Sequence, residues 1–332
     1  MAQQEFSIPS LMNRLGTEAD AYQLLEELRW GADKADVVCP HCGVIGGHYF
    51  LTPANGSSRA TRMTAKNGKV SERRVWKCCS CRKQFSVLTG TIFHGTKISV
   101  RTWVMVVLEM CASKNGVSAR EIERKYDLTA KTAWYMLHRI REAMKQDPMA
   151  GLLRGTIIAD ETFIGGKPKN RHADDPRQRG AGFSDKQPVL ALVDFETREV
   201  RSRAIPDVTA ETLRDEITPQ VDIEHSQLWT DELRAYRRIG EKFNSHHTVN
   251  HKDGQYKNRG ATTNTVEGYF SQLKRSLDGT HHHVSVEHLN RYLAQFDFMY
   301  TNCKATDSER MVRLIDNVAG RRLSYKPLTG QA

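Results

Sequence analysis

The chain has 332 residues, enough for two or three domains, and 39% of them are hydrophobic and 27% charged. This balance is typical of globular proteins and too polar for a membrane helix, which needs roughly 20 consecutive apolar residues. The first residues also lack the layout of a signal peptide. We therefore expect a cytoplasmic protein with no membrane partner. The net charge of +10 favours a polyanionic partner.

The first predicted element is an amphipathic helix over residues 17–30. Thr17 is a suitable N-cap, and Asp20 three positions later can complete a capping box. An apolar stripe at helical spacing is formed by Leu24, Leu25 and Leu28.

Two Cys-x-x-Cys pairs follow the helix, Cys39/Cys42 in CPHC and Cys78/Cys81 in CCSC. Two such pairs supply the four tetrahedral ligands of a structural zinc ion, and a cytosolic protein uses close cysteine pairs for metal more often than for disulfides. Cys79 offers another start for the second pair, but only Cys78 keeps the two-residue spacing. The spacer between the pairs exceeds the usual roughly 15–20 residues, so we expect an extended ribbon or loop to fill it.

A helix-turn-helix pattern occupies residues 116–144. Ser118 opens its first helix, Asp127–Leu128 forms the turn, and Thr129 caps the second helix. In such motifs the start of the second helix contacts DNA phosphates and base edges. The residues that we expect to make these contacts are Lys131, Thr132, Tyr135 and Arg139.

Beyond residue 148 the pattern becomes strand-like, which predicts an α/β fold with a mixed sheet. The predicted strands are Thr156–Phe163, Val189–Phe195, Val200–Ile205 and Gln227–Thr230, with a helical segment before the last.

Acidic residues end the apolar runs of two of these strands, within the first strand and at the close of the last. Asp160 and Asp231 each follow apolar residues, and a buried carboxylate is costly without a partner or a metal. Strand alternation predicts that Glu161 faces away from Asp160, so that only one of them joins a site. On a helix that begins near residue 264, Glu267 and Lys274 are seven positions apart and share one face. Each acid alone also fits a solvent-facing position; together they favour a Mg²⁺ site.

The order of the motifs ADETFIGGK, WTDE and NTVEGYFSQLKRSL resembles the DDE arrangement of RNase H-like transposases and integrases. With CPHCG and WKCCSCRKQFSVLTGTIF ahead of them, the chain is similar to bacterial insertion-sequence transposases of the ISXO-like family. The resemblance implies that Asp160, Asp231 and Glu267 bind two Mg²⁺ (or Mn²⁺) ions and that Lys274 is the accompanying basic residue. Such families sometimes place an asparagine at the third acidic position, which leaves Asn264 as an alternative ligand.

The resemblance also implies a function and a domain order. The expected enzyme binds the terminal inverted repeats of its element in double-stranded DNA, cuts a phosphodiester and joins the freed end to target DNA, as a homo-oligomer associated with the bacterial nucleoid. The expected regions are an N-terminal helix and zinc ribbon (1–95), a helix-turn-helix region (96–148), an RNase H-like DDE catalytic domain (149–305) and a C-terminal tail (306–332).

Basic, turn-rich stretches supply further expected contacts with the DNA backbone. These residues are Lys167, Lys169, Arg171, Lys252, Lys257 and Arg259. Two alternative functions stay open: a metal-dependent, structure-specific nuclease that performs no strand transfer, and a DNA-binding regulator whose C-terminal domain is inactive.

Overall fold

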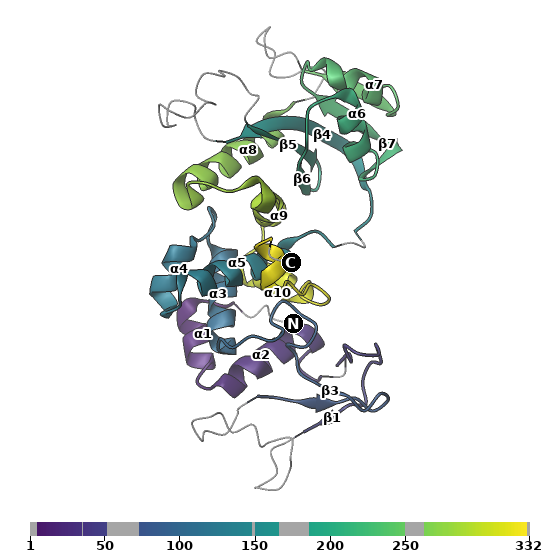
Figure 1. Cartoon of the computed structure of the whole chain (residues 1–332). Helices are drawn as coiled ribbons and strands as arrows, with labels where there is room; N and C mark the ends of the chain where they lie inside the picture. The colour runs from purple at the N-terminus through teal and green to yellow at the C-terminus, as the bar shows by residue number, and fades with distance from the viewer. Residues whose placement is uncertain are drawn as a thin grey trace. The chain divides into compact units, whose positions relative to one another are not determined.

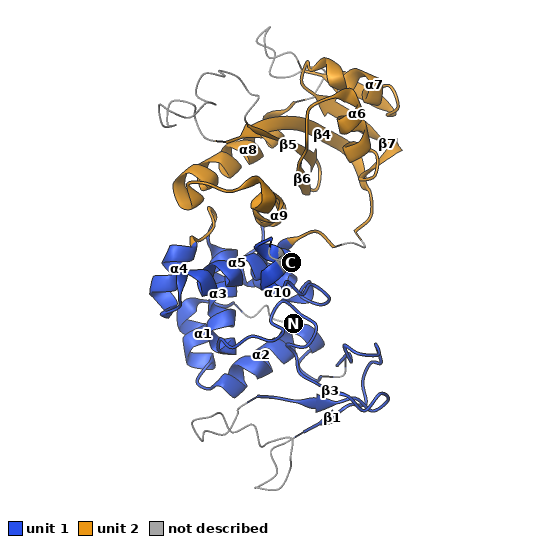
Figure 2. Cartoon of the chain, viewed as in Figure 1, with its two compact units in different colours: residues 1–113, 119–144, 304–332 blue, residues 114–118, 145–303 orange. Residues whose placement is uncertain are grey.

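The computed structural model describes residues 5–34, 36–51, 73–147, 150–165, 186–249 and 262–330. The chain divides into two compact units, which are described separately here (Figure 2). Unit 1 comprises residues 1–113, 119–144 and 304–332, and unit 2 comprises residues 114–118 and 145–303. Every helix within the described ranges is too short or too polar to cross a lipid bilayer.

Unit 1 begins with helices α1 (Ile8–Arg14) and α2 (Glu18–Trp30). The predicted capping box of α2 is confirmed, since the Thr17 side chain accepts a hydrogen bond from the Asp20 amide and the Asp20 side chain accepts one from the Thr17 amide at 2.7 Å. A small antiparallel sheet follows, with the order β1-β2-β3. Its strands are β1 (Tyr49–Phe50), β2 (Trp76–Lys77) and β3 (Gln84–Phe85).

The predicted helix-turn-helix is present as α4 (Ala119–Tyr126) and α5 (Ala130–Met144), which follow α3 (Val100–Ala112). Asp127 adopts a left-handed backbone conformation (φ 50°) at the turn, and the Thr129 hydroxyl accepts a hydrogen bond from the Thr132 amide at 3.2 Å, as expected of an N-cap.

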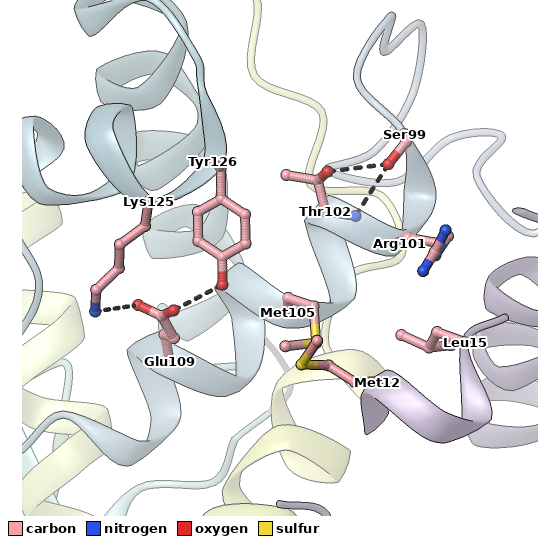
Figure 3. A pocket seen from close by; sticks show the side chains of 9 residues that line it. All are labelled: Met12, Leu15, Ser99, Arg101, Thr102, Met105, Glu109, Lys125 and Tyr126. Atoms are coloured by element: carbon pink, nitrogen blue, oxygen red, sulfur yellow. Dashed lines mark hydrogen bonds and ion pairs between the residues drawn. The ribbon is translucent and has the colours of Figure 1, made fainter. Parts of the chain in front are cut away.

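A cavity of about 500 Å³ lies beside α3 and α4 (Figure 3). At one end of it, Glu109 accepts hydrogen bonds from the Tyr126 hydroxyl at 2.6 Å and from the Lys125 ammonium at 3.0 Å. The side chains of Met12 and Met105 form an apolar part of the cavity wall (Figure 3). Because Glu109 belongs to α3 and its two partners to α4, these bonds fix the first helix of the helix-turn-helix to the core of unit 1.

The segment 306–332, expected to be a tail, forms helix α10 (Asp307–Asp316) and the short helix α11 (Tyr325–Leu328). Helix α10 packs against α2, α3 and α5. Its buried side chains Met311, Leu314 and Ile315 recur at helical spacing. Unit 1 therefore takes its core from both ends of the chain, and the four regions expected from the sequence stay a proposal about how the chain is organised.

Unit 2 contains a five-stranded mixed sheet in the order β6-β5-β4-β7-β8. Strands β4, β5 and β6 form an antiparallel meander, whereas β7 and β8 run parallel to β4. In chain order within this unit the strand order is 3-2-1-4-5, which confirms the expected RNase H-like α/β fold. The strands are β4 (Leu153–Ile164), β5 (Gln187–Asp194), β6 (Val200–Ala204), β7 (Val221–Thr230) and β8 (Ser245–Thr248).

Helices cover both faces of this sheet (Figure 1). Ile158 of β4 packs with α8 and α9 on one face, whereas Ile157 and Ala159 pack with α6 and the η5–α7 turn on the other. The alternation along β4 therefore assigns each side chain to a face. The bounds are α6 (Ala210–Ile217), η5 (Arg234–Tyr236), α7 (Arg237–Gly240), α8 (Asn264–Ser276), η7 (Leu277–His281) and α9 (Val286–Thr301).

Candidate functional site

Three carboxylates converge where β7 ends beside β4. One oxygen from each of Asp160, Glu161 and Asp231 lies within 4.8 Å of the others, and all three residues are half-buried. The parallel register explains this, because Ile158 pairs with Trp229 and the residues two positions further along the chain are Asp160, within β4, and Asp231, just beyond the end of β7. Carboxyl ends of adjacent parallel strands are a common location for ligand sites in α/β sheets.

Glu161 faces away from Asp160, as the strand alternation predicts, but it lies close to the other two acids. Its side chain does belong to the opposite face of β4 from Asp160, where its carboxylate accepts a hydrogen bond from the buried Tyr236 hydroxyl at 2.8 Å. However, β7 stops at Thr230, and one oxygen of Glu161 still lies within 4.8 Å of those of Asp160 and Asp231. That only one of the two neighbouring acids joins a metal site stays a prediction.

Glu267 lies in the first turn of α8 and is exposed. The Thr263 hydroxyl donates a hydrogen bond to its carboxylate at 2.7 Å, and its charge is one of those that raise the pKa of Asp160. Glu267 is outside the 4.8 Å group found among the described residues. Asn264 and Lys274 are exposed on the same helix, so the choice between Glu267 and Asn264, and the role of Lys274, stay predictions.

The cluster is electrostatically suited to a cation. Burial raises the pKa of Asp160 to about 8, and the negative charges of Glu161 and Asp231 act in the same direction. Burial likewise raises the pKa of Glu161 to about 7, although the hydrogen bond from Tyr236 opposes this change. Converging carboxylate oxygens are the ligands that Mg²⁺ prefers, and a divalent cation would offset the repulsion that otherwise favours protonation.

We expect the protein without bound Mg²⁺ or Mn²⁺ to lose thermal stability as the pH rises. The ordinary pKa of an aspartate, which applies in the unfolded chain, is 3.8, whereas the pKa of Asp160 in the folded chain is about 8. Between these values the folded protein binds more protons than the unfolded chain, so the free energy of unfolding falls with rising pH. Melting temperatures of the zinc-loaded protein in buffer without Mg²⁺ or Mn²⁺ should fall between pH 5 and pH 8, and added Mg²⁺ or Mn²⁺ should restore them at pH 8.

The control for this measurement is Asp160→Asn, because other acids titrate in the same range. Burial raises the pKa of Asp297 to about 7, and that contribution is common to both proteins. The variant should show a shallower fall with pH and a weaker response to the cations. Equal slopes in the two proteins would contradict the placement of Asp160 in a metal-binding cluster.

The four predicted zinc ligands come together in unit 1. The Sγ atoms of Cys39 and Cys81 are 3.8 Å apart, and those of Cys42 and Cys78 are 3.6 Å apart. A tetrahedron with metal–sulfur bonds of about 2.3 Å has edges of about 3.8 Å, so the geometry fits a structural zinc ion. Cys79 lies outside this group, and its amide donates a hydrogen bond to His48 at 3.4 Å.

A buried carboxylate attaches the zinc ribbon to α2. Glu26 is fully buried and accepts hydrogen bonds from the Trp76 indole at 2.9 Å and from the Arg74 guanidinium at 2.8 Å. The Trp30 ring also packs edge-on against Trp76 and Phe85. Residues 52–72 of the long spacer lie outside the described residues.

The residues predicted to contact nucleic acid have different environments. Lys131 is exposed at the start of α5, and Thr132 and Tyr135 are half-buried there. Arg139 is only 5% exposed, and its guanidinium donates a hydrogen bond to the His94 carbonyl at 2.7 Å and stacks near Trp103. The charged group of Arg139 is therefore part of the packing of unit 1, and its contact with DNA stays a prediction.

The basic loops expected to contact the DNA backbone are outside the part of the chain that the structure describes. Their predicted contact residues are Lys167, Lys169, Arg171, Lys252, Lys257 and Arg259.

Comparisons with known proteins match both units. The family model of the ISXO2-like transposase domain matches residues 152–301, and that of the transposase zinc-ribbon domain matches residues 16–84. An uncharacterized protein in transposable element ISH50 of Halobacterium salinarum is 27% identical over 290 residues, which cover 84% of this chain and 90% of that protein. Among solved structures, a chain of the simian T-cell lymphotropic virus intasome in complex with PP2A regulatory subunit B56 gamma has a TM-score of 0.27 and 14% identity, over 57% of this chain and 66% of that chain.

Proposed function

Because residues 152–301 match the family model of the ISXO2-like transposase domain and residues 16–84 that of the transposase zinc-ribbon domain, we propose that the chain is a transposase, a DDE enzyme that cuts and joins DNA. It binds the terminal inverted repeats of an insertion sequence and transfers the cut ends to target DNA. The observation that carries the proposal is the convergence of Asp160, Glu161 and Asp231 where β7 ends beside the parallel strand β4, inside the matched transposase domain.

In this proposal Asp160, Asp231 and Glu267 hold two Mg²⁺ (or Mn²⁺) ions. The ions supply activation of the attacking oxygen and neutralisation of charge on the leaving oxygen. Glu161, held by Tyr236, limits how far the neighbouring carboxylates can move and adds negative charge to the site. Lys274 lies two helical turns after Glu267 and contacts a DNA phosphate near the cut.

The proposed DNA-binding part is unit 1. Helix α5 presents Lys131 and Thr132 to the terminal repeat, and the zinc ribbon and the basic loops add contacts with the backbone. Two element ends must be held together for joining, so the active form is a homo-oligomer on DNA. Since its substrate is the chromosome and the element within it, the protein acts in the bacterial cytoplasm at the nucleoid.

The test of the third ligand compares Glu267→Gln with Asn264→Ala in a Mg²⁺-dependent cleavage assay. The substrate is DNA that carries the element's own ends, identified from the sequence that flanks the gene. Wild type should cleave it, Glu267→Gln should be slower by roughly 100-fold or more because a metal ligand is lost, and Asn264→Ala should retain activity.

The opposite result, a large loss in Asn264→Ala with retained activity in Glu267→Gln, would assign the third position to Asn264. Binding without cleavage by wild type would contradict the proposed enzyme and favour a DNA-binding regulator. Gel-shift binding of the same DNA is the control that separates lost chemistry from lost binding.

A further inference from the structure

The C-terminal segment 319–328 is joined to two parts of unit 1. Ala319 forms a β-bridge with Thr91, and the Gly320 amide donates a hydrogen bond to the Gly90 carbonyl at 2.9 Å, which attaches the segment to the chain that follows the zinc ribbon. The Arg321 guanidinium donates a hydrogen bond to the Glu142 carbonyl of α5 at 2.9 Å. The segment is thus a fixed part of unit 1.

Further along, the segment contacts the residues of α5 that were predicted to reach DNA. The Tyr135 hydroxyl donates a hydrogen bond to the Leu323 carbonyl at 2.6 Å. The Tyr135 and Tyr325 rings meet edge to face at 5.3 Å, and the Lys131 ammonium lies 4.5 Å from the centre of the Tyr325 ring. Leu328, 3% exposed, anchors the end of the segment. Tyr325 therefore restricts where the ammonium of Lys131 can lie.

Positive charge gathers around this contact. Arg322, Lys326 and Lys131 are all exposed. The neighbouring His94 is half-buried; its pKa is lowered by burial first and then by positive charges, of which Arg322 is the largest. The exposed cations of the segment and of α5 therefore add to one basic surface.

The segment can either cover the phosphate-binding surface of α5 or add to that surface, and its charge decides between these two roles. A segment that covers a phosphate-binding surface competes best when it carries acidic groups that mimic the phosphates. Residues 319–328 (AGRRLSYKPL) contain three basic residues and no acidic residue. The segment therefore extends the basic surface of α5.

We propose that residues 319–328 form part of the DNA-binding surface of unit 1, where Arg322 and Lys326 contact the phosphate backbone of double-stranded DNA beside Lys131. The inference rests on the proposed function and assigns a DNA-binding role to a segment that the sequence predicted to be a tail. Phosphate contacts carry little sequence information, so these residues should contribute equally to element ends and to other DNA.

The test measures the affinity of the full-length protein for two duplexes of equal length, a terminal repeat and an unrelated sequence, by fluorescence anisotropy over a series of salt concentrations. The double variant Arg322→Ala/Lys326→Ala should bind both duplexes roughly tenfold or more weakly, and its slope of log affinity against log salt should be smaller by roughly two. The matched control is Arg203→Ala/Arg214→Ala, which removes two exposed arginines of unit 2 that pair with carboxylates.

Zinc content and melting temperature confirm that each variant is folded. Unchanged affinity and salt slope in Arg322→Ala/Lys326→Ala would overturn the inference while leaving the proposed function intact. Tighter binding by this variant would also overturn it, because the segment would then be a cover over α5. If wild type binds neither duplex, the proposed function fails, and the inference fails with it.

Discussion

Asp160→Asn is expected to reduce Mg²⁺-dependent cleavage of element-end DNA by about 10³-fold or more without weakening DNA binding. Asp160 occupies the central strand next to β7, and its carboxylate lies among those of Glu161 and Asp231. Asparagine keeps the shape of the side chain but removes the negative charge that a divalent cation requires. Cleavage rates under single-turnover conditions measure this loss directly.

Unfolding cannot account for such a loss, because the substitution removes a repulsive buried charge. The raised pKa of Asp160 means that its ionised form destabilises the fold when no Mg²⁺ or Mn²⁺ is bound, so the zinc-loaded variant should melt at a higher temperature than zinc-loaded wild type at pH 8 in buffer without Mg²⁺ or Mn²⁺. The matched control is Asp215→Asn, an exposed aspartate of α6, which should cleave at the wild-type rate. A wild-type rate for Asp160→Asn would remove Asp160 from the site.

Loss of one zinc ligand is the second large effect that we expect. Cys78→Ser should release the zinc ion and unfold the ribbon, because metal binding by such sites contributes apparent free energies of roughly 10–16 kcal/mol and the ribbon's strands are only two residues long. The measurements are zinc content per chain and the near-ultraviolet circular dichroism of the packed Trp30 and Trp76 pair.

Cys79→Ser is the matched control, since it removes the adjacent thiol and leaves the four-cysteine group complete. This variant should keep one zinc ion per chain and the wild-type spectrum. Loss of zinc from Cys79→Ser would instead show that the neighbouring group of His48, Cys78 and Cys79 holds the ion in place of the predicted set.

Features that depend on local pattern could be predicted from the sequence. The capping box at Thr17, the paired cysteines and the alternation around Asp160 each involve residues that are close in the chain, and the structure has all three. The mixed α/β sheet followed from the succession of strands and helices and from the resemblance to RNase H-like enzymes.

Features that depend on distant partners could not be predicted in this way. The approach of Glu161 to Asp231 requires knowing where β7 ends. The burial of Arg139 requires the distant Trp103 and the His94 carbonyl, which surround its guanidinium. Helix α10 differs from these features because it could have been predicted from the sequence. Its apolar residues recur at helical spacing, although the segment that contains it was expected to be a tail.

The most direct test of the central proposal, that the chain is a transposase, is strand transfer with pre-cut element ends. Wild-type protein, Mg²⁺, a duplex with a free terminal 3′-hydroxyl and a supercoiled target plasmid are incubated together, with Asp160→Asn in parallel. We predict joined products with wild type and none with the variant. Cleavage of intact element ends by wild type without any joining of pre-cut ends would contradict the proposal, because the protein would then be a nuclease with the same metal site.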